Sequence, residues 1–328
     1  MPACGPGCSD GAGIAPAWNN GVMRPHVKLD VNTLLLLILP PLLWAGNAVV
    51  GRLMVGRIPP LALSFDRWFL ALLVALLFTG PGLWRQRALL LQHWKPLARM
   101  GFLGVACYNS MQYVALHTTT PLNVSLITSA APVFILLIGA AFYREPIGPA
   151  SWWGAALSVA GVVVVVTKGR IDHLLQLHLA TGDLIMLLAV LLWGFYTWEL
   201  RRRPLGLTPF ASLTVQMAWG SLFIAPFAAF EHWGLGESTH WAMPVVLAIG
   251  YVALLASLLA YVCWGTAVAR TGAQIPAYFG NLAPVFAAVL SYLFLHEAIA
   301  LYHLIGAALI FAGIHVALRA RPRVAPAV

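Results

Sequence analysis

Long apolar runs constrain this sequence more than any other feature. Runs of about 20 residues, the length that spans a bilayer core about 30 Å thick, recur from residue 31 to residue 319 with short connections between them. Only 9% of the 328 residues are charged, whereas a soluble domain carries about 25%. Runs such as Leu34 to Leu39 show no alternation of polar and apolar residues, which a transmembrane barrel would need. The sequence therefore predicts an all-α integral membrane protein.

The runs predict ten transmembrane helices. Their expected ranges are 31–51, 59–79, 97–116, 119–142, 151–167, 180–199, 208–230, 241–268, 273–295 and 301–319. Residues 1–30 lack the charged start and apolar core of a signal peptide and are expected to be a disordered leader. Residues 320–328 are expected to be a cytoplasmic tail.

The distribution of Lys and Arg predicts the orientation. An even number of spans puts both termini on one side of the membrane, and cytoplasmic segments carry an excess of Lys and Arg. Fourteen basic residues fall on the side of the termini: Arg24, Lys28, Arg85, Arg87, Lys95, Arg99, Arg144, Arg201, Arg202, Arg203, Arg270, Arg319, Arg321 and Arg323. Four fall on the other side: Arg52, Arg57, Lys168 and Arg170. A multi-pass protein of a bacterial inner membrane with both termini cytoplasmic is expected.

An internal repeat divides the chain into two halves. Residues 131–166 align without a gap onto 283–318 at an offset of 284 − 132 = 152. The aligned residues include Ala131-Pro132 with Ala283-Pro284, Glu145 with Glu297, Gly154 with Gly306, and Gly161 with Gly313. The front of each half matches at an offset of 149, with Trp44 facing Trp193, Arg52 facing Arg201 and Pro60 facing Pro209. Each half, 31–167 and 180–319, then holds five helices, and an odd number of spans per repeat forces the halves into inverted orientations.

These residues resemble the EamA family of the drug/metabolite transporter (DMT) superfamily in its ten-helix form. The pattern is Tyr113-Val-Ala-Leu116, then Ala131-Pro132, Glu145 and the paired glycines, with the second copy in the other half. Within that family the sequence is most similar to the YddG-type exporters of aromatic and neutral amino acids. The resemblance implies a central cavity between the halves that serves alternating access.

Two adjacent charges lie within the second predicted helix. Asp66 and Arg67 point about 100° apart, so at least one should contact a neighbouring helix. In one interpretation Arg67 faces the cavity and attracts a substrate carboxylate, because charges inside a membrane are usually functional. A structural ion pair or snorkelling to the interface is the alternative, and the sequence favours neither. The repeat places Gln216 opposite Arg67, so the charge belongs to one half only.

Aromatic and amide side chains recur at matched positions of the two halves. Trp44 and Trp193 lie inside the first helix of each half, where an indole can stack on a planar substrate. An interfacial belt is the alternative for these two, and interhelical hydrogen bonds are the alternative for the polar groups. The predicted substrate site consists of Trp44, Asn47, Arg67, Tyr108, Asn109, Gln112, Trp193, Tyr196, Gln216, Tyr261 and Trp264.

The prolines and glycines of the repeat predict where helices bend and where they pack closely. Pro132 and Pro284 are predicted inside helices, where proline frees a carbonyl and makes a hinge or a static kink. Four glycines permit close helix approach, either within the chain or in a dimer: Gly154, Gly161, Gly306 and Gly313.

The sequence accordingly predicts a secondary transporter that exports small organic solutes, with aromatic and other neutral amino acids first. Cationic drugs, purines and nucleotide sugars stay open as alternatives. A membrane enzyme would need a motif such as His-Glu-x-x-His, which the sequence lacks, and a single Asp-Arg pair gives little support to a channel. We expect no cofactor and no metal, a small-molecule substrate and membrane lipid as partners, and no nucleic acid. The oligomeric state stays open.

Overall fold

The protein is an all-helical membrane protein. A computed structural model describes residues 30–119, 124, 127–170, 180–202, 206–287, 289 and 300–319. The predicted leader and tail lie outside this range, apart from residue 30. Within it, six helices are long and apolar enough to cross a membrane. They are α1 (Val31–Leu53), α2 (Pro60–Arg85), α10 (Thr181–Arg202), α11 (Pro209–Ala229) with η2 (Phe230–Gly234), α12 (Met243–Tyr251) with η3 (Val252–Leu259) and α13 (Ala260–Thr271), and α16 (Leu301–Arg319).

Shorter helices complete the bundle. α7 (Ala131–Tyr143) and α8 (Pro149–Val166) are apolar. After α3 (Arg87–Gln92), α4 (Trp94–Met100), η1 (Gly101–Cys107) and α5 (Tyr108–Thr118) form one continuous helix. That helix is not among the six because it carries a polar stretch, which includes Asn109, Ser110 and Gln112.

The fourth and ninth predicted helices are each interrupted before a proline. α7 begins after a turn at Ala130, and Thr119, where the prediction began, is extended. In the second half, a turn at residues 281–282 separates α14 (Gln274–Gly280) from the helical residues that follow. Pro132 and Pro284 thus lie in the first turn of a new helix, and the prediction that they lie inside helices is wrong. Proline has no N–H to donate, and the first helical turn needs none.

Two helices contain a π-helical turn at the same place of the repeat. η1 interrupts the helix between α4 and α5, and η3 interrupts the helix between α12 and α13. The offset of 152 carries residues 101–107 onto 253–259, which lie within η3. π turns inside α-helices frequently occur at functional sites.

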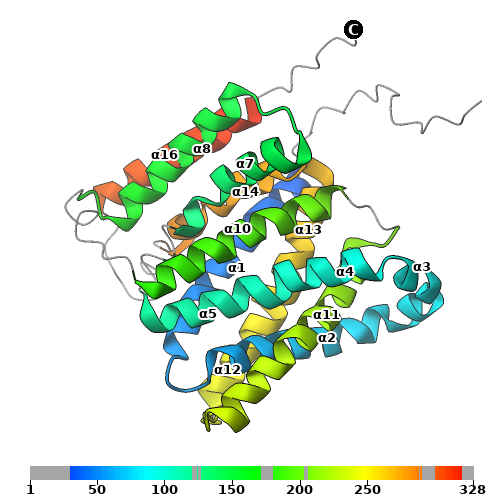
Figure 1. The fold of residues 1–328 in the computed structure, drawn as a ribbon. Helices are drawn as coiled ribbons and strands as arrows, with labels where there is room; N and C mark the ends of the chain where they lie inside the picture. Colours follow the sequence, from blue (N-terminus) through cyan, green and yellow to red (C-terminus); the bar gives the residue numbers. More distant parts are fainter. Residues whose placement is uncertain are drawn as a thin grey trace, which may run out of the picture.

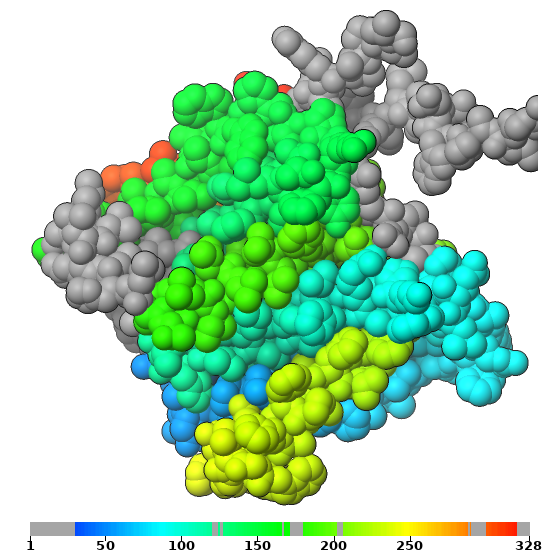
Figure 2. All heavy atoms as spheres, viewed as in Figure 1, coloured from blue at the N-terminus to red at the C-terminus, as the bar shows by residue number. Residues whose placement is uncertain are grey.

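Equivalent helices of the two halves pack against each other at both edges of the bundle. α2 packs on α11 and α8 packs on α16, while between these pairs α1 packs on α13 and α5 on α10. Figure 1 shows the α8–α16 pair at one edge and α2 with α11 at the other. On the face drawn in Figure 2, α10 of the second half lies between α5 and α7 of the first half. The two halves are therefore interleaved through most of the described core.

Glycines make the contact between α8 and α16. A Cβ on Gly154 would lie 2.8 Å from the carbonyl oxygen of Gly313, and a Cβ on Gly161 would lie 2.6 Å from that of Gly306. Any larger residue would push the helices apart. Since the later glycine of α8 meets the earlier glycine of α16, the helices run antiparallel. These four glycines serve packing within the chain.

Candidate functional site

A polar cluster surrounds Arg67 where α1, α2, α5 and η3 meet. The side chain of Arg67 is 0% exposed, and its Nε donates to Oγ of Ser257 at 2.7 Å. Its Nη1 donates to three oxygens: Oδ1 of Asn47 at 3.2 Å, Oδ1 of Asn109 at 2.9 Å and the hydroxyl of Tyr113 at 2.6 Å. Because Ser257 belongs to the second half, Arg67 joins the two halves.

The positive charge of Arg67 has only neutral hydrogen-bond partners. Among the residues that the structure describes, no carboxylate oxygen lies within 4.0 Å of it, and Nη2 has no hydrogen-bond partner. Its Cζ lies 5.0 Å from the ring centroid of Trp68 and 5.6 Å from that of Tyr113. Among the described residues, Arg67 therefore forms no structural ion pair, and its buried side chain does not snorkel to the membrane interface. These were the two alternatives that the sequence left open. A buried charge without a counterion costs several kcal/mol, which is tolerated where a function requires it.

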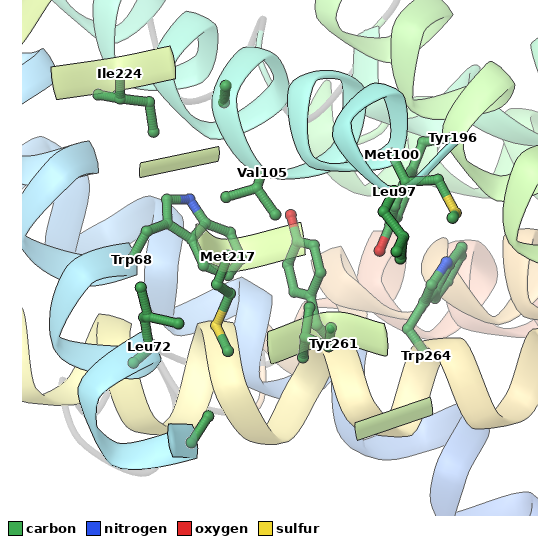
Figure 3. Packing of buried hydrophobic residues seen from close by; sticks show 14 of the residues in the cluster. Trp68, Leu72, Leu97, Met100, Val105, Tyr196, Met217, Ile224, Tyr261 and Trp264 are labelled. Atoms are coloured by element: carbon green, nitrogen blue, oxygen red, sulfur yellow. The ribbon is translucent and has the colours of Figure 1, made fainter. Parts of the chain in front are cut away.

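An aromatic cluster adjoins the polar one. The Trp193 centroid lies close to the centroids of Trp44 (5.5 Å), Trp264 (5.3 Å), Tyr261 (5.5 Å) and Tyr108 (4.8 Å). All four pairs are T-shaped or tilted, and aromatic pairs avoid the face-to-face sandwich. Figure 3 shows Tyr261 between Trp68 and Trp264, and its ring centroid lies 4.9 Å from that of Trp68.

Tyr261 connects the two clusters through its hydroxyl. That oxygen accepts from Nδ2 of Asn109 at 2.7 Å and donates to the carbonyl oxygen of Gly104 at 3.0 Å. In the opposite direction between the halves, Nε1 of Trp44 in the first half donates to the carbonyl oxygen of Ala256 in the second at 3.0 Å. Gly104 lies in η1 and Ala256 in η3. Each π turn thus presents a backbone oxygen to a side chain of the site.

Every predicted site residue except Gln216 lies in these two contiguous clusters. Asn47 reaches Gln112 through Nδ2 to Oε1 at 3.4 Å, and Tyr196 packs against Trp193 with ring centroids 5.0 Å apart. Gln216 is buried on α11, but its Nε2 donates to Ser212 of the same helix at 2.9 Å. No hydrogen bond that the structure describes joins Gln216 to the Arg67 cluster.

Three residues of the site were missed by sequence reasoning. Tyr113 follows Asn109 by four positions and so shares its helical face, a signal that the sequence contains. Ser257 had no such signal, because the repeat places Val105 opposite it at the offset of 152. Trp68 directly follows Arg67 in the sequence, and no sequence feature marked it as part of the site. In the structure its ring packs against Tyr261 and lies beside the guanidinium of Arg67.

One end of the bundle is tied by an ion pair between the halves. Arg99 of α4 donates from Nη2 to Oε2 of Glu199 on α10 at 2.6 Å. The hydroxyl of Tyr143, at the end of α7, donates to the other oxygen of Glu199 at 3.1 Å. In the predicted orientation this end is cytoplasmic.

The opposite end is also tied across the halves. The carboxylate of Glu231, in η2, accepts the backbone N–H groups of Leu61 and Ala62 at 3.0 and 2.9 Å, and thereby caps the start of α2. A negative charge at a helix N-terminus is stabilising. Thr119 of the first half donates to Asp183 of the second. Polar contacts therefore hold the halves together at both ends of the aromatic and polar clusters.

A repeated helical bundle with a charged and aromatic centre defines a polytopic membrane transporter. The family model of the EamA-like transporter family matches residues 31–167 and again 180–319. The chain belongs to this family, which confirms the resemblance at the family level.

Similar proteins agree with the family. An uncharacterized transporter of Archaeoglobus fulgidus is 30% identical over 88% of this chain and 97% of its own. A probable amino-acid metabolite efflux pump of Escherichia coli K12 is 25% identical over 86% and 93%. A probable terminal-alkyne amino-acid exporter of Streptantibioticus cattleyicolor is 25% identical over 85% and 90%. A crystal structure at 24% identity superposes with a TM-score of 0.68, covering 87% of this chain and 96% of its own, which shows a shared fold.

Proposed function

We propose that this transporter exports small organic carboxylates, with aromatic and other neutral amino acids first, by alternating access through the site between the two halves. The observation that carries the proposal is the charge of Arg67, which is fully buried and has only neutral hydrogen-bond partners in the described structure. A substrate carboxylate would supply the missing counter-charge. The adjoining aromatic rings would receive an apolar or planar side chain, as apolar walls of binding sites do.

The names of two relatives support the substrate class. One is a probable amino-acid metabolite efflux pump and another a probable terminal-alkyne amino-acid exporter. The likeness to YddG-type exporters belongs to the same proposal. A cationic drug is disfavoured because the site presents a cation and, in the described residues, no carboxylate beside it.

We further infer ten spans arranged as two inverted halves with both termini cytoplasmic. The antiparallel contact of Gly154 with Gly313 and of Gly161 with Gly306 supports inversion, since each glycine meets the repeat equivalent of the other. Reporter enzymes fused after Lys95, Arg203 and Arg321 should all report the cytoplasm, and an external signal at any of them contradicts the topology.

The helix breaks at Pro132 and Pro284 support a role as hinges. Discontinuous helices of transporters line substrate sites and move during alternating access. If a Pro132→Ala variant exchanges substrate at the wild-type rate, Pro132 is not a hinge.

The experiment for the substrate class is counterflow in proteoliposomes. Radiolabelled phenylalanine and alanine are compared with a quaternary ammonium drug, a purine and a nucleotide sugar. The wild type should exchange the amino acids, and Arg67→Ala should slow both about tenfold or more, because each loses its carboxylate partner. Arg85→Ala is the control, since Arg85 is exposed at the end of the same helix. Exchange of the drug, and of neither amino acid, would refute the proposal.

A further inference from the structure

We propose that the site recognises the carboxylate and the aromatic body of its substrate and makes no demand for an amino group. Aromatic monocarboxylates without an ammonium group would then be substrates at least as good as the amino acids. This inference rests on the proposed function and narrows its substrate class. It follows from where the acidic residues lie and from the polar atoms that the site leaves unpaired.

The acidic residues are few, and the described ones have positions away from the site. The chain has ten Asp and Glu, of which Asp10, Asp172 and Glu297 lie outside the described residues, which leaves 10 − 3 = 7. Asp30 caps α1, and three others make the end contacts given above: Asp183, Glu199 and Glu231. Glu145 and Glu237 lie in connections that follow α7 and η2. Only Asp66 is near Arg67 in the sequence.

Asp66 is half-buried on α2. It shares a helical face with Phe69, Leu73 and Leu77, at spacings of three, seven and eleven residues, and these three side chains are exposed on the bundle surface. Arg67, one position later, points about 100° away and is fully buried. In the described structure, then, no carboxylate faces the aromatic cluster to receive a substrate ammonium.

The unpaired polar atoms of the two clusters are donors. Nη2 of Arg67, Nε1 of Trp68 and Nε1 of Trp264 are buried without a hydrogen-bond partner. Arg67 and Trp68 contact each other, and Trp264 packs against Trp44 and Trp193 with ring centroids 5.3 Å apart in both pairs. The acceptors around Arg67, by contrast, are already engaged: Asn47, Asn109, Tyr113 and Ser257.

Other atoms without partners in the described structure are on Gln216, Thr128 and Ser221. The first is an acceptor on α11, and the other two are hydroxyls that can donate or accept. A site with spare N–H groups and a free positive charge suits an acceptor-rich anion. An ammonium brings a like charge and three more donors.

The test uses three ligands that differ in one group. Phenylalanine carries both charged groups, 3-phenyllactate replaces the amine by a hydroxyl, and phenylalaninol replaces the carboxylate by an alcohol. Each is titrated as an inhibitor of radiolabelled phenylalanine counterflow and, on the purified protein, by tryptophan fluorescence. We expect 3-phenyllactate to bind at least as tightly as phenylalanine, and phenylalaninol at least about tenfold more weakly.

The outcomes separate this inference from the proposed function. If phenylalanine binds and is exchanged but 3-phenyllactate binds about tenfold more weakly, the inference is wrong and the proposed function stands. If 3-phenyllactate binds and is exchanged while phenylalanine is not, the inference stands and the amino-acid assignment falls. Binding of phenylalaninol as tight as that of phenylalanine, or no binding by any of the three, overturns the inference.

Substitution of Arg67 tests whether the preference for a carboxylate arises at this site. Arg67→Gln should abolish the preference for 3-phenyllactate over phenylalaninol, whereas Arg85→Gln, at the exposed end of α2, should retain it. Retention of the preference in a folded Arg67→Gln protein contradicts the assignment to this site. If that variant does not fold, the wild-type series still decides between carboxylate and amine.

Discussion

At the residue scale, the buried charge of the site has no counterpart in the other half. Arg67 has Gln216 as its repeat equivalent, and Ser257, which binds Arg67, has Val105. Duplicated halves therefore share a scaffold but not a site. A substrate with one charged end and one apolar end is itself asymmetric, and an asymmetric site can bind it in one orientation.

Trp193 offers the sharpest test of the aromatic cluster, because it contacts five other rings of the site. Trp193→Ala should lower phenylalanine transport about twofold to tenfold more than alanine transport, since aromatic contacts are lost while the polar ones remain. The measurement is counterflow of both amino acids at equal protein levels. Trp153→Ala is the control, because Trp153 is 68% exposed on α8.

Two results bear on this prediction. Trp193→Phe keeps a ring and should recover part of the difference between the two substrates. If folded Trp193→Ala protein transports phenylalanine and alanine as the wild type does, the aromatic cluster does not contact the substrate.

The composition of the site was largely visible in the sequence, for a physical reason. Polar groups inside apolar helices are costly, so they stand out and mark places where helices meet. Residues such as Asn47, Asn109 and Tyr261 were recognised in this way. Ser257 and Trp68 were not recognised, because serine and tryptophan are tolerated at many positions of apolar helices and do not by themselves mark a site. Only the packing of η3 and α2 brings these two residues to Arg67.

At the element scale, helix continuity is the property that the sequence predicted least well. An α-helix and a π-helix in a membrane have the same apolar composition, so the hydrophobicity of the sequence did not predict η1 and η3. Their matched positions and their contacts with Tyr261 and Trp44 tie them to the site. The breaks before Pro132 and Pro284 were expected as kinks, yet each is the start of a helix.

The glycine contact between α8 and α16 yields a stability prediction. In Gly161→Ala the new methyl group would meet the carbonyl oxygen of Gly306, a backbone atom that cannot rotate away. The protein should lose about 1 to 3 kcal/mol of stability, as overpacked sites do. Thermal unfolding of purified protein in detergent measures the loss.

A matched control separates packing from helix propensity. Gly82 lies in α2, and a Cβ there has nothing within 4 Å. Gly82→Ala should leave stability unchanged or raise it, because alanine favours the helix by about 1 kcal/mol. Equal effects of the two substitutions would show that the α8–α16 contact does not limit stability.

At the scale of the whole molecule, the contacts that join the halves at both ends bear on the proposed alternating access. Alternating access requires one end of the bundle to open while the other is closed. The ion pair of Arg99 with Glu199 joins the halves at one end, and Glu231 joins them at the start of α2 at the other. A partly exposed ion pair is worth about 1 kcal/mol or less, so such a tie can break in each cycle.

Cross-linking tests this motion. In a protein whose four native cysteines are replaced, a thiol-reactive cross-linker with a reducible link should join Arg99→Cys to Glu199→Cys and remove nearly all counterflow. Reduction of the link should restore counterflow, because the tie must open for exchange. The single substitutions treated with the same cross-linker are the controls. Full counterflow by the cross-linked protein would show that this end does not open.

The membrane fold, the two halves and most side chains at the centre could be predicted from the sequence, because hydrophobicity and repeat register can be read along the chain. The family was predicted from its resemblance to known motifs. Three features became visible only in the folded protein. Among the described residues, Arg67 has only neutral hydrogen-bond partners, and Gln216 forms no hydrogen bond with them. The π-helical turns η1 and η3 face the site. Such facts depend on how helices rotate and approach one another, and helices of equal apolarity can pack in many rotations until glycine contacts and buried hydrogen bonds select one.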